Sequence, residues 1–368
     1  MKQIAIREPG KVSIIEVREP KMSSPSQIKS RTIHTGISIG SELTEYRGSV
    51  ADIRETWKNT KSKTSKIDWL EEWKFPFFPG YENVGKVVEV GECVDNVKAG
   101  DRVIHCGPHA EVCVVPQTQA HLPVYAVIPN SVSDEDATFA VLGTTALWGV
   151  MVGRVRYGEN VVTLGDGVVG ILSALHAKLA GANKSILVGL SDRKLQVAKE
   201  AGVDVTINHR DENWTDRIAD VTDGLGPDVV LEAVGSSTST SGTVREACEI
   251  AKEKGRVVLV GWHMARQTDW IPGADFYFKE LTMYTSRAMG PGSHHPFLLD
   301  SLNKIQEYNY LRWTTSDLFR YVIQLIEERK LNVHPLVTHR YKYTEASEVY
   351  RRIDEAKEDF LQVLLTGW

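Results

Sequence analysis

Six residues in the second half of the sequence, Gly165-Asp166-Gly167-Val168-Val169-Gly170, have the spacing of a dinucleotide-binding turn. The pattern alone is weak, but here it follows the apolar run NVVTL and opens a segment with helical spacing. The first glycine permits a tight turn, the second a close backbone approach to a pyrophosphate, and the third close packing of helix on strand. The N–H groups and the dipole of the helix N-terminus favour bound phosphate.

The next apolar run, SILVGLSDRK, bears on which dinucleotide binds. NAD-preferring folds usually place an acid at the end of this strand, about 20 residues after the turn, where it holds the ribose hydroxyls. This chain has Gly189 near that point, and Ser191 and Arg193 can donate hydrogen bonds to a 2′-phosphate. The pattern therefore favours NADP. The alternative is that Asp192 holds the ribose and that NAD binds.

The elements that must position these residues fall into two patterns. Residues 1 to about 145 contain short β-branched runs separated by Gly and Pro, which is typical of a small barrel or sandwich. From about residue 146, strands alternate with helices, which indicates an α/β unit with a doubly wound parallel sheet. The final apolar run, LQVLLTG, is expected to return to the first domain. We therefore predict a discontinuous domain of residues 1–145 and 300–368, and a second domain of residues 146–299.

One polar stretch, residues 51–75, interrupts the first pattern and carries Trp57, Trp69 and Trp73. We interpret it as a helical or loop insertion. A solvated flap whose tryptophans pack on the barrel is slightly favoured over a lid above a substrate pocket.

Composition limits the class of protein. The chain has 368 residues, 42% hydrophobic and 25% charged, with a formal net charge of -5, as in ordinary globular proteins. The acidic balance argues against nucleic acid and anionic membranes as partners, and no apolar run approaches the roughly 20 residues of a membrane span. Four cysteines are too few for a disulfide scaffold, and the N-terminus lacks a signal-peptide block, so we expect a cytoplasmic protein.

Several segments together resemble the medium-chain dehydrogenase/reductase superfamily: HTGISIGSELTEYRG (34–48), FPGYENVGKVVEVGECVDNVKAGDRV (78–103), the glycine turn, GPDVVLEAVG (226–235), GRVVLVG (255–261) and VHPLVTHRYKYTEASEVYRRI (333–353). The resemblance implies a GroES-like β-barrel catalytic domain and a Rossmann domain with the active site in the cleft between them. It also implies hydride transfer with NAD(P) and a homodimer or homotetramer. Its cofactor contacts would include Thr145, Val234, Gly235, Val260 and Gly261, and Thr144 and Trp262 lie beside them.

The chain departs from the zinc-dependent members of that superfamily. Their Cys ligand lies in the segment that matches residues 36–43, where this chain has no Cys, and their His ligand lies where this chain has Tyr81. Only Cys106 and Cys113 lie near the position of a four-cysteine zinc lobe. Thiolate and imidazole ligands dominate protein zinc sites, so we expect no catalytic zinc. A zinc site that uses Glu82 with His109 is the less favoured alternative. The chain looks like the zinc-lacking branch, which includes dehydrogenases for polyols, sugars and chlorin side-chain alcohols.

Without zinc, alcohol oxidation still needs a proton acceptor and hydrogen-bond donors to the reacting oxygen. The segments that match the family's cleft offer His109 and Glu82 as alternatives for the acid/base, with His105 in reserve. Ser41 and Tyr81 are predicted donors to the substrate oxygen. Glu42 and Tyr46 are further candidates, although any one of these residues can instead have a purely structural role.

The leading hypothesis is a zinc-independent oxidoreductase that interconverts a secondary alcohol and a ketone on a polyol, cyclitol or sugar-like substrate. One alternative is an NADPH-dependent quinone or enoyl reductase, which needs no base on the alcohol side. Another is a non-catalytic nucleotide-binding protein with the same fold.

Overall fold

The structure is a computed structural model that describes residues 1–51, 74–116, 118–119, 122–123, 125–235, 242–263, 273–290 and 313–368. The chain divides into two compact units. Unit 1 is Met1–Thr138 with Val337–Trp368, and unit 2 is Phe139–Leu336. The insertion with its three tryptophans, predicted at residues 51–75, lies almost wholly outside the described residues.

The unit boundaries differ from the expected ones at 145/146 and 299/300. Helix α11 (Thr315–Glu327) packs along α5 (Ala140–Val152), and both belong to unit 2. A side chain at Gly143 of α5 would come within 2.7 Å of Val322 on α11, so the glycine permits this close packing. Six buried apolar residues of α11 form the face that holds it there.

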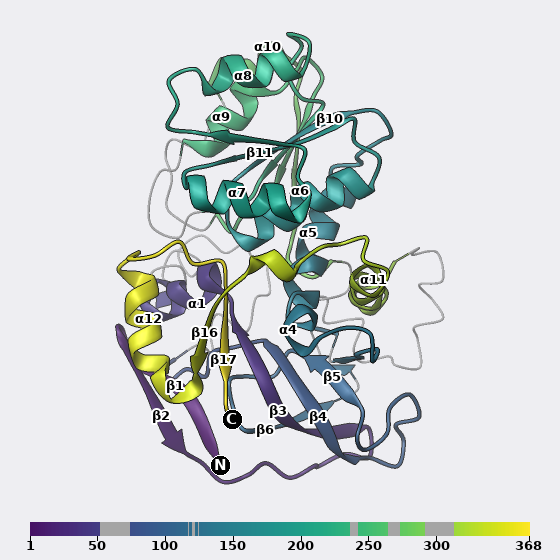
Figure 1. The fold of residues 1–368 in the computed structure, drawn as a ribbon, viewed down its shortest axis with the longest axis vertical. Helices are drawn as coiled ribbons and strands as arrows, with labels where there is room; N and C mark the ends of the chain where they lie inside the picture. The colour runs from purple at the N-terminus through teal and green to yellow at the C-terminus, as the bar shows by residue number, and fades with distance from the viewer. Residues whose placement is uncertain are drawn as a thin grey trace, which may run out of the picture. The chain divides into compact units, whose positions relative to one another are not determined.

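Unit 1 is built on a mostly antiparallel sheet that the strand β17 enters (Figure 1). β17 (Gln362–Thr366) lies between β16 (Val337–Lys342) and β3 (Gln27–Ile37), which confirms the predicted return of this strand. The sheet continues through β4 (Glu82–Val90), β5 (Arg102–His105) and β9 (Tyr125–Val127), and β6 (Val112–Pro116) also pairs with β3. Outside it, β1 (Lys2–Glu8) pairs with β2 (Lys11–Glu16), and β7 (Thr118–Gln119) pairs with β8 (Leu122–Pro123).

Short helices cover part of this unit. α1 (Ile39–Tyr46) follows β3 directly, α4 (Asp134–Ala137) precedes the passage into unit 2, and α12 (Ala346–Asp354) lies between β16 and β17 in sequence. An apolar cluster joins α1, α12, β1 and β17, with Ile4, Ile37, Val363 and Leu365 among its most deeply buried members. This core fixes α1, which carries three of the predicted site residues, Ser41, Glu42 and Tyr46.

Unit 2 contains the predicted parallel sheet of six strands in the order β12-β11-β10-β13-β14-β15 (Figure 1). By position in the sequence this is the 3-2-1-4-5-6 order of dinucleotide-binding folds, which bind their ligand at the carboxyl ends of the strands. The strands are β10 (Asn160–Leu164), β11 (Lys184–Gly189), β12 (Val205–Asn208), β13 (Val229–Glu232), β14 (Arg256–Leu259) and β15 (Thr282–Thr285). The helices between them are α6 (Val168–Leu179), α7 (Asp192–Ala201), α8 (Trp214–Val221), α9 (Thr243–Ile250) and α10 (Gly273–Phe278).

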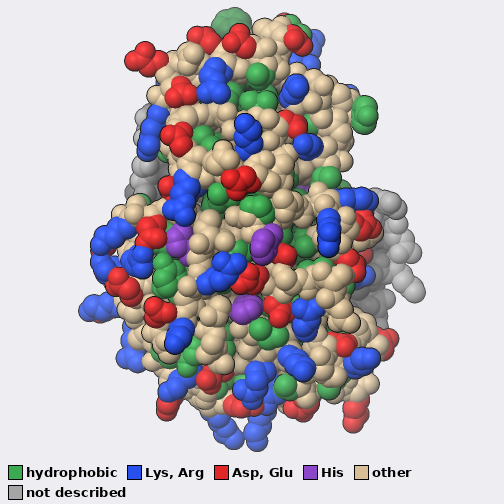
Figure 2. All heavy atoms as spheres, viewed as in Figure 1, with side chains coloured by type: hydrophobic (Ala, Val, Ile, Leu, Met, Phe, Trp, Pro, Cys, Tyr) green, Lys and Arg blue, Asp and Glu red, His purple; other side chains and the backbone are tan. Residues whose placement is uncertain are grey.

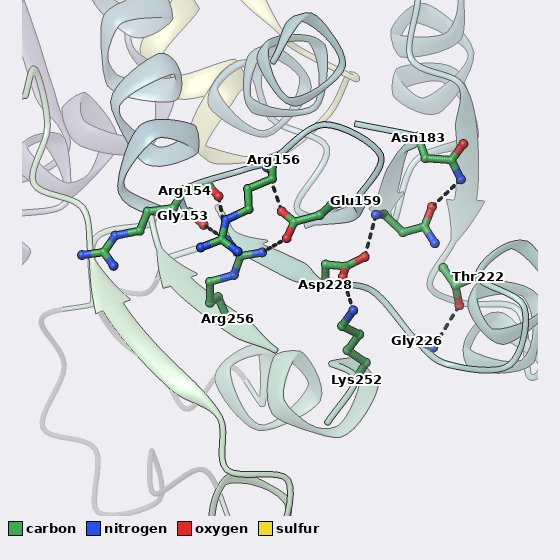
Figure 3. A network of polar contacts seen from close by, with 11 residues as sticks. Gly153, Arg154, Arg156, Glu159, Asn183, Thr222, Gly226, Asp228, Lys252 and Arg256 are labelled. Carbon is green, nitrogen blue, oxygen red and sulfur yellow. Dashed lines mark hydrogen bonds and ion pairs between the residues drawn. The ribbon is translucent and has the colours of Figure 1, made fainter. Parts of the chain in front are cut away.

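Charged side chains close the opposite, amino-terminal edge of that sheet (Figure 3). Arg256, at the start of β14, donates to the carbonyl oxygens of Gly153 and Arg154 at 2.9 and 2.6 Å and pairs with Glu159. Asp228, just before β13, accepts from the N–H of Asn160 at 2.8 Å. These bonds tie the strand starts together, so the polar residues at this edge serve the fold.

Acidic and basic side chains are interspersed over the face of the molecule in Figure 2. Among the described residues, no helix is long and apolar enough to cross a membrane.

Candidate active site

The glycine turn of unit 2 has the geometry that its sequence predicts. Gly165 has φ +113°, a left-handed conformation that favours glycine, and its N–H donates to the carbonyl of Val188 on the neighbouring strand at 2.8 Å. A Cβ on Gly170 would overlap the carbonyl oxygen of Gly165. Both glycines are therefore required for the tight turn and for seating α6 against β10.

The N-terminus of α6 is left open for a ligand. Its N-cap is Gly167, no side chain caps it, and its first turn holds no acid. By contrast, Ser191 caps α7, and Thr314 caps α11 through a capping box. A Cβ on Gly167 would meet nothing within 4 Å, so space remains in front of the free N–H groups of the turn. This cradle fits the pyrophosphate of a dinucleotide.

The other predicted cofactor residues follow neighbouring strands of the same sheet. Val234 is 50% exposed just after β13. Gly235 and Gly261 are so close that a Cβ on either would overlap the backbone of the other loop. Val260 packs against α5, in which Thr145 is also nearly buried. Val168 and Val169 begin α6, and the exposed Arg193 lies in the first turn of α7.

A buried carboxylate, absent from the sequence prediction, supports these loops. Glu232, at the end of β13, accepts hydrogen bonds from the N–H groups of Val234 and Gly235 at 3.1 and 3.2 Å and from Thr243 at 2.9 Å. Its second oxygen contacts His263 after β14. The carboxylate thus fixes both loops, and the single histidine gave no spacing pattern that would have revealed it.

In unit 1, the structure brings the predicted catalytic residues into one polar cluster. β3 ends at Ile37, and α1 then carries Ser41 and Glu42. Tyr81 and Glu82 lie at the start of β4, which pairs with β3, and Glu82 is opposite Gly36 in that register. His109 follows β5, and its carbonyl oxygen accepts from the N–H of Ile4 on β1. Strand pairing therefore assembles the cluster from three separate segments.

Glu42 and His109 form the fully buried side of this cluster. The Glu42 carboxylate accepts from His109 Nε2 at 3.0 Å, from the backbone N–H of Ser38 at 2.8 Å, and from the hydroxyl of Tyr350 on α12. Gly80 packs directly on the His109 ring, since a Cβ there would lie 2.8 Å from Cγ. With three donors satisfied, this carboxylate braces α1 against α12.

Glu82 has a different environment. Its side chain is 0% exposed, and Oε2 accepts from Gln362 Nε2 at 2.7 Å. No described residue hydrogen-bonds to Oε1. Burial raises the pKa of Glu82 to about 8, the hydrogen bond from Gln362 opposes this rise, and the nearby charge of Glu42 adds to it. A carboxyl group with this pKa can exchange a proton near neutral pH.

The hydroxyl group of Tyr81, the residue before Glu82, is linked to two serine hydroxyl groups. The Tyr81 hydroxyl donates to Ser38 Oγ and also hydrogen-bonds with Ser41. Burial, followed by the charge of Glu82, raises the pKa of Tyr81 well above its ordinary value. Tyr81 therefore stays a neutral hydroxyl group, suited to donate a hydrogen bond rather than to accept a proton as phenolate.

The same residues test the family's catalytic zinc. Ser38 and Tyr81 occupy the segments in which the resemblance places the Cys and His ligands, and their hydroxyls bond to each other. Neutral hydroxyls are poor substitutes for thiolate and imidazole. No group of three His, Cys, Asp or Glu residues among the described parts of the chain could hold a metal ion. The donor set does not fit zinc.

The remaining candidates have structural surroundings. His105 is buried, its Nδ1 accepts from the N–H of Gly107 at 3.0 Å, and burial lowers its pKa to about 3. Tyr46 belongs to the core, with its ring 5.8 Å from that of Tyr350. Gln362 on β17 and Tyr350 on α12, which contact Glu82 and Glu42 respectively, were not predicted, because only the folded chain brings them near.

Comparisons with known proteins agree with this arrangement. A family model described as "Alcohol dehydrogenase GroES-like domain" matches residues 51–132, and one described as "Zinc-binding dehydrogenase" matches residues 168–303. The chain is 26% identical to sorbitol dehydrogenase 1 of Saccharomyces cerevisiae, covering 94% of this chain and 92% of that protein. It is 28% identical to L-threonine 3-dehydrogenase of Pyrococcus horikoshii, covering 95% and 94% respectively.

Solved structures share the fold over the whole chain. A protein of Sinorhizobium meliloti 1021, assigned as a zinc-binding dehydrogenase and solved with NADP, has a TM-score of 0.75 at 22% identity. An alcohol dehydrogenase of E. coli CFT073, solved with NADH, also has a TM-score of 0.75 at 22% identity. In both comparisons 100% of this chain and 99% of the other are covered.

Proposed function

Because this chain belongs to the medium-chain dehydrogenase/reductase superfamily and is an NAD(P)-dependent alcohol oxidoreductase, we propose that it interconverts a secondary alcohol and a ketone without a catalytic zinc ion. The substrate class that we propose is a polyol, cyclitol or sugar-like molecule. The observation that carries the proposal is the buried Glu82 carboxyl, with one oxygen unpartnered among the described residues and a pKa of about 8, next in sequence to Tyr81, whose hydroxyl group is linked to two serine hydroxyl groups.

In this proposal Glu82 is the acid/base. Oxidation of an alcohol removes a hydride from the carbinol carbon and a proton from its hydroxyl, and the nicotinamide, when bound, accepts the hydride. Ionised Glu82 accepts the proton at Oε1, while Gln362 holds Oε2 in place. In the reverse direction the protonated carboxyl returns the proton to the oxygen of the ketone. A pKa near the working pH suits both directions.

The neighbouring side chains have separate roles. Ser41 and Tyr81 position the substrate oxygen by hydrogen bonding, and the high pKa of Tyr81 keeps its hydroxyl group protonated. Glu42 and His109 are positioning residues in this proposal, because their bonds to each other and to Tyr350 fix the start of α1. The sequence left Glu82 and His109 as alternatives for the acid/base. His109 Nδ1 and Glu82 Oε1 both lack a partner among the described residues, so the raised pKa of Glu82 and the bond that holds His109 to Glu42 are what favour Glu82.

Two considerations support the finer parts of the proposal. The hydroxyl-rich cluster offers hydrogen bonds to a substrate with many hydroxyl groups, and sorbitol dehydrogenase 1 is among the relatives. The mutual hydrogen bond of Ser38 and Tyr81 at the two expected ligand positions supports zinc independence. Quinone or enoyl reduction would not need a proton acceptor of this kind on the alcohol side.

The test is a panel of polyols, cyclitols, sugars and quinones, assayed with NAD(P) and NAD(P)H after dialysis against a chelator. We expect polyol oxidation to persist, to rise with pH through about 8 as Glu82 ionises, and to fall roughly 10²- to 10⁴-fold in Glu82→Gln. Glu111→Gln is the matched control, because Glu111 accepts from the N–H of Lys2 outside the cluster. Activity that is lost on chelation and restored by zinc would overturn the zinc-free part. Reduction of quinones with no oxidation of any polyol would overturn the substrate class.

A further inference from the structure

Asp166, the second residue of the glycine turn, reaches across to the end of the neighbouring strand. Its Oδ2 accepts hydrogen bonds from the backbone N–H groups of Leu190 and Ser191, at 2.7 and 2.8 Å. A Cβ on Gly189 would overlap the Cβ of Asp166 and lie 2.7 Å from Oδ2. The Asp166 side chain therefore occupies the space of a side chain at position 189.

That space is where this fold distinguishes its two cofactors. In NAD-binding members an acid at the end of the second strand holds the ribose hydroxyls, and a 2′-phosphate is excluded. Position 189 is a glycine here, but a carboxylate still stands beside it. Among the described residues, hydrogen-bond donors reach only Oδ2, so Oδ1 is available to a ribose hydroxyl.

The surrounding groups also bear on a 2′-phosphate. The N–H groups of Leu190 and Ser191 are donors that such a phosphate would use, and Asp166 already holds both. The Ser191 hydroxyl caps α7 by accepting from the N–H of Lys194 at 3.2 Å. Asp192, the alternative ribose acid, is bonded to Asn208 at 2.7 Å. The exposed Arg193 is the feature that still favours a phosphate.

We propose that Asp166 selects the dinucleotide, taking the place of the strand-end acid, and that this enzyme prefers NAD to NADP. The inference rests on the proposed dinucleotide-dependent function and deepens it. It reverses the preference predicted from the sequence, because that prediction depended on the absence of an acid at position 189. Gly189 instead leaves the space that the Asp166 side chain fills, since acidic side chains at both 166 and 189 would overlap.

The experiment measures the binding of NADH and NADPH by fluorescence titration, together with kcat/KM for NAD and NADP. We expect the wild-type protein to favour the NAD forms. Asp166→Ser removes the charge and Asp166→Asn keeps the shape, so in both variants the preference should shift toward the NADP forms by roughly 10- to 100-fold. Asp192→Ser, the neighbouring acid, is the control and should leave the ratio unchanged.

A positional swap provides a second, independent test. Gly189→Asp alone should destabilise the protein because its side chain overlaps Asp166, whereas Asp166→Gly with Gly189→Asp should restore both folding and NAD preference. Wild-type preference for NADPH, or an unchanged ratio in both Asp166 variants, would overturn the inference while leaving the proposed function intact. A failure of the wild-type protein to bind either nucleotide would instead overturn the proposed function.

Discussion

The unusual protonation of Glu82 predicts how stability depends on pH. The Glu82 carboxyl is fully buried, and its pKa is about 8 against an ordinary value of 4.5. Between these two pH values, the folded protein therefore keeps a proton on Glu82, whereas the unfolded chain has already released it. Stability from this source is complete below the ordinary pKa and is lost as the pH rises through the folded value.

The size of this effect follows from the same values. Between about pH 5 and about pH 9, the wild-type protein should lose about 4 kcal/mol of unfolding free energy relative to Glu82→Gln, which has no carboxyl group to ionise. Urea unfolding of both proteins across this range, followed by tryptophan fluorescence, measures the difference directly. Subtracting the variant removes the titration of every other group.

Two further measurements make the result decisive. Infrared difference spectra should show a protonated carboxyl band that disappears near pH 8 in the wild-type protein and is missing in Glu82→Gln. Glu348→Gln, on the exposed face of α12, is the control, because a hydrogen bond from Arg351 lowers the pKa of Glu348. The stability that the ionised Glu348 carboxylate contributes is lost only as the pH falls. The difference in unfolding free energy between wild type and Glu348→Gln should therefore stay constant above about pH 5. A difference between wild type and Glu82→Gln that changes by less than about 1 kcal/mol would refute the reasoning.

Three further predictions follow from contacts in the two units. Gln362→Leu removes the hydrogen bond that lowers the pKa of Glu82, so the rise of alcohol oxidation should move to higher pH in a pH–rate profile. Glu42→Gln leaves buried donors poorly satisfied and should cost roughly 2–4 kcal/mol, measured as a lower Tm. Gly170→Ala should destabilise unit 2 because its Cβ overlaps the turn, whereas Gly167→Ala should leave Tm unchanged and weaken dinucleotide binding in a titration.

Each of these has an outcome that would contradict it. An unchanged profile for Gln362→Leu would mean that this bond does not tune the acid. A Tm of Glu42→Gln within about 1 °C of the wild-type value would mean that the buried bonds add little. Equal dinucleotide affinity in Gly167→Ala and the wild-type protein would place the pyrophosphate elsewhere.

The sequence was most informative where the physical signal is local. Alternating strands and helices predicted the parallel sheet, and the glycines at 165 and 170 predicted a turn whose geometry admits no side chain. The resemblance also grouped Ser41, Tyr81 and Glu82, which the structure places in one cluster. These features can be predicted from the sequence because steric limits on the backbone act between near neighbours, and strand pairing acts along matched segments.

Other features depend on contacts that no local pattern carries. Gln362 and Glu82 are 280 residues apart, and only the entry of β17 beside β3 joins them. The reach of Asp166 to the loop after β11 depends on the space left by Gly189, so the two residues are interpretable only as a pair. The boundary expected at residue 300 failed to include α11 in unit 2, because the apolar face of that helix does not reveal which surface it will cover.

The place of β17 in unit 1 has a consequence for biosynthesis. The ribosome makes the whole of unit 2 before it makes the strand that lies between β16 and β3. During translation the nucleotide-binding half can close its core while β3 still exposes an unpaired edge that invites aggregation. The nascent chain can therefore complete its glycine turn before Glu82, the proposed proton acceptor, gains its hydrogen bond from Gln362.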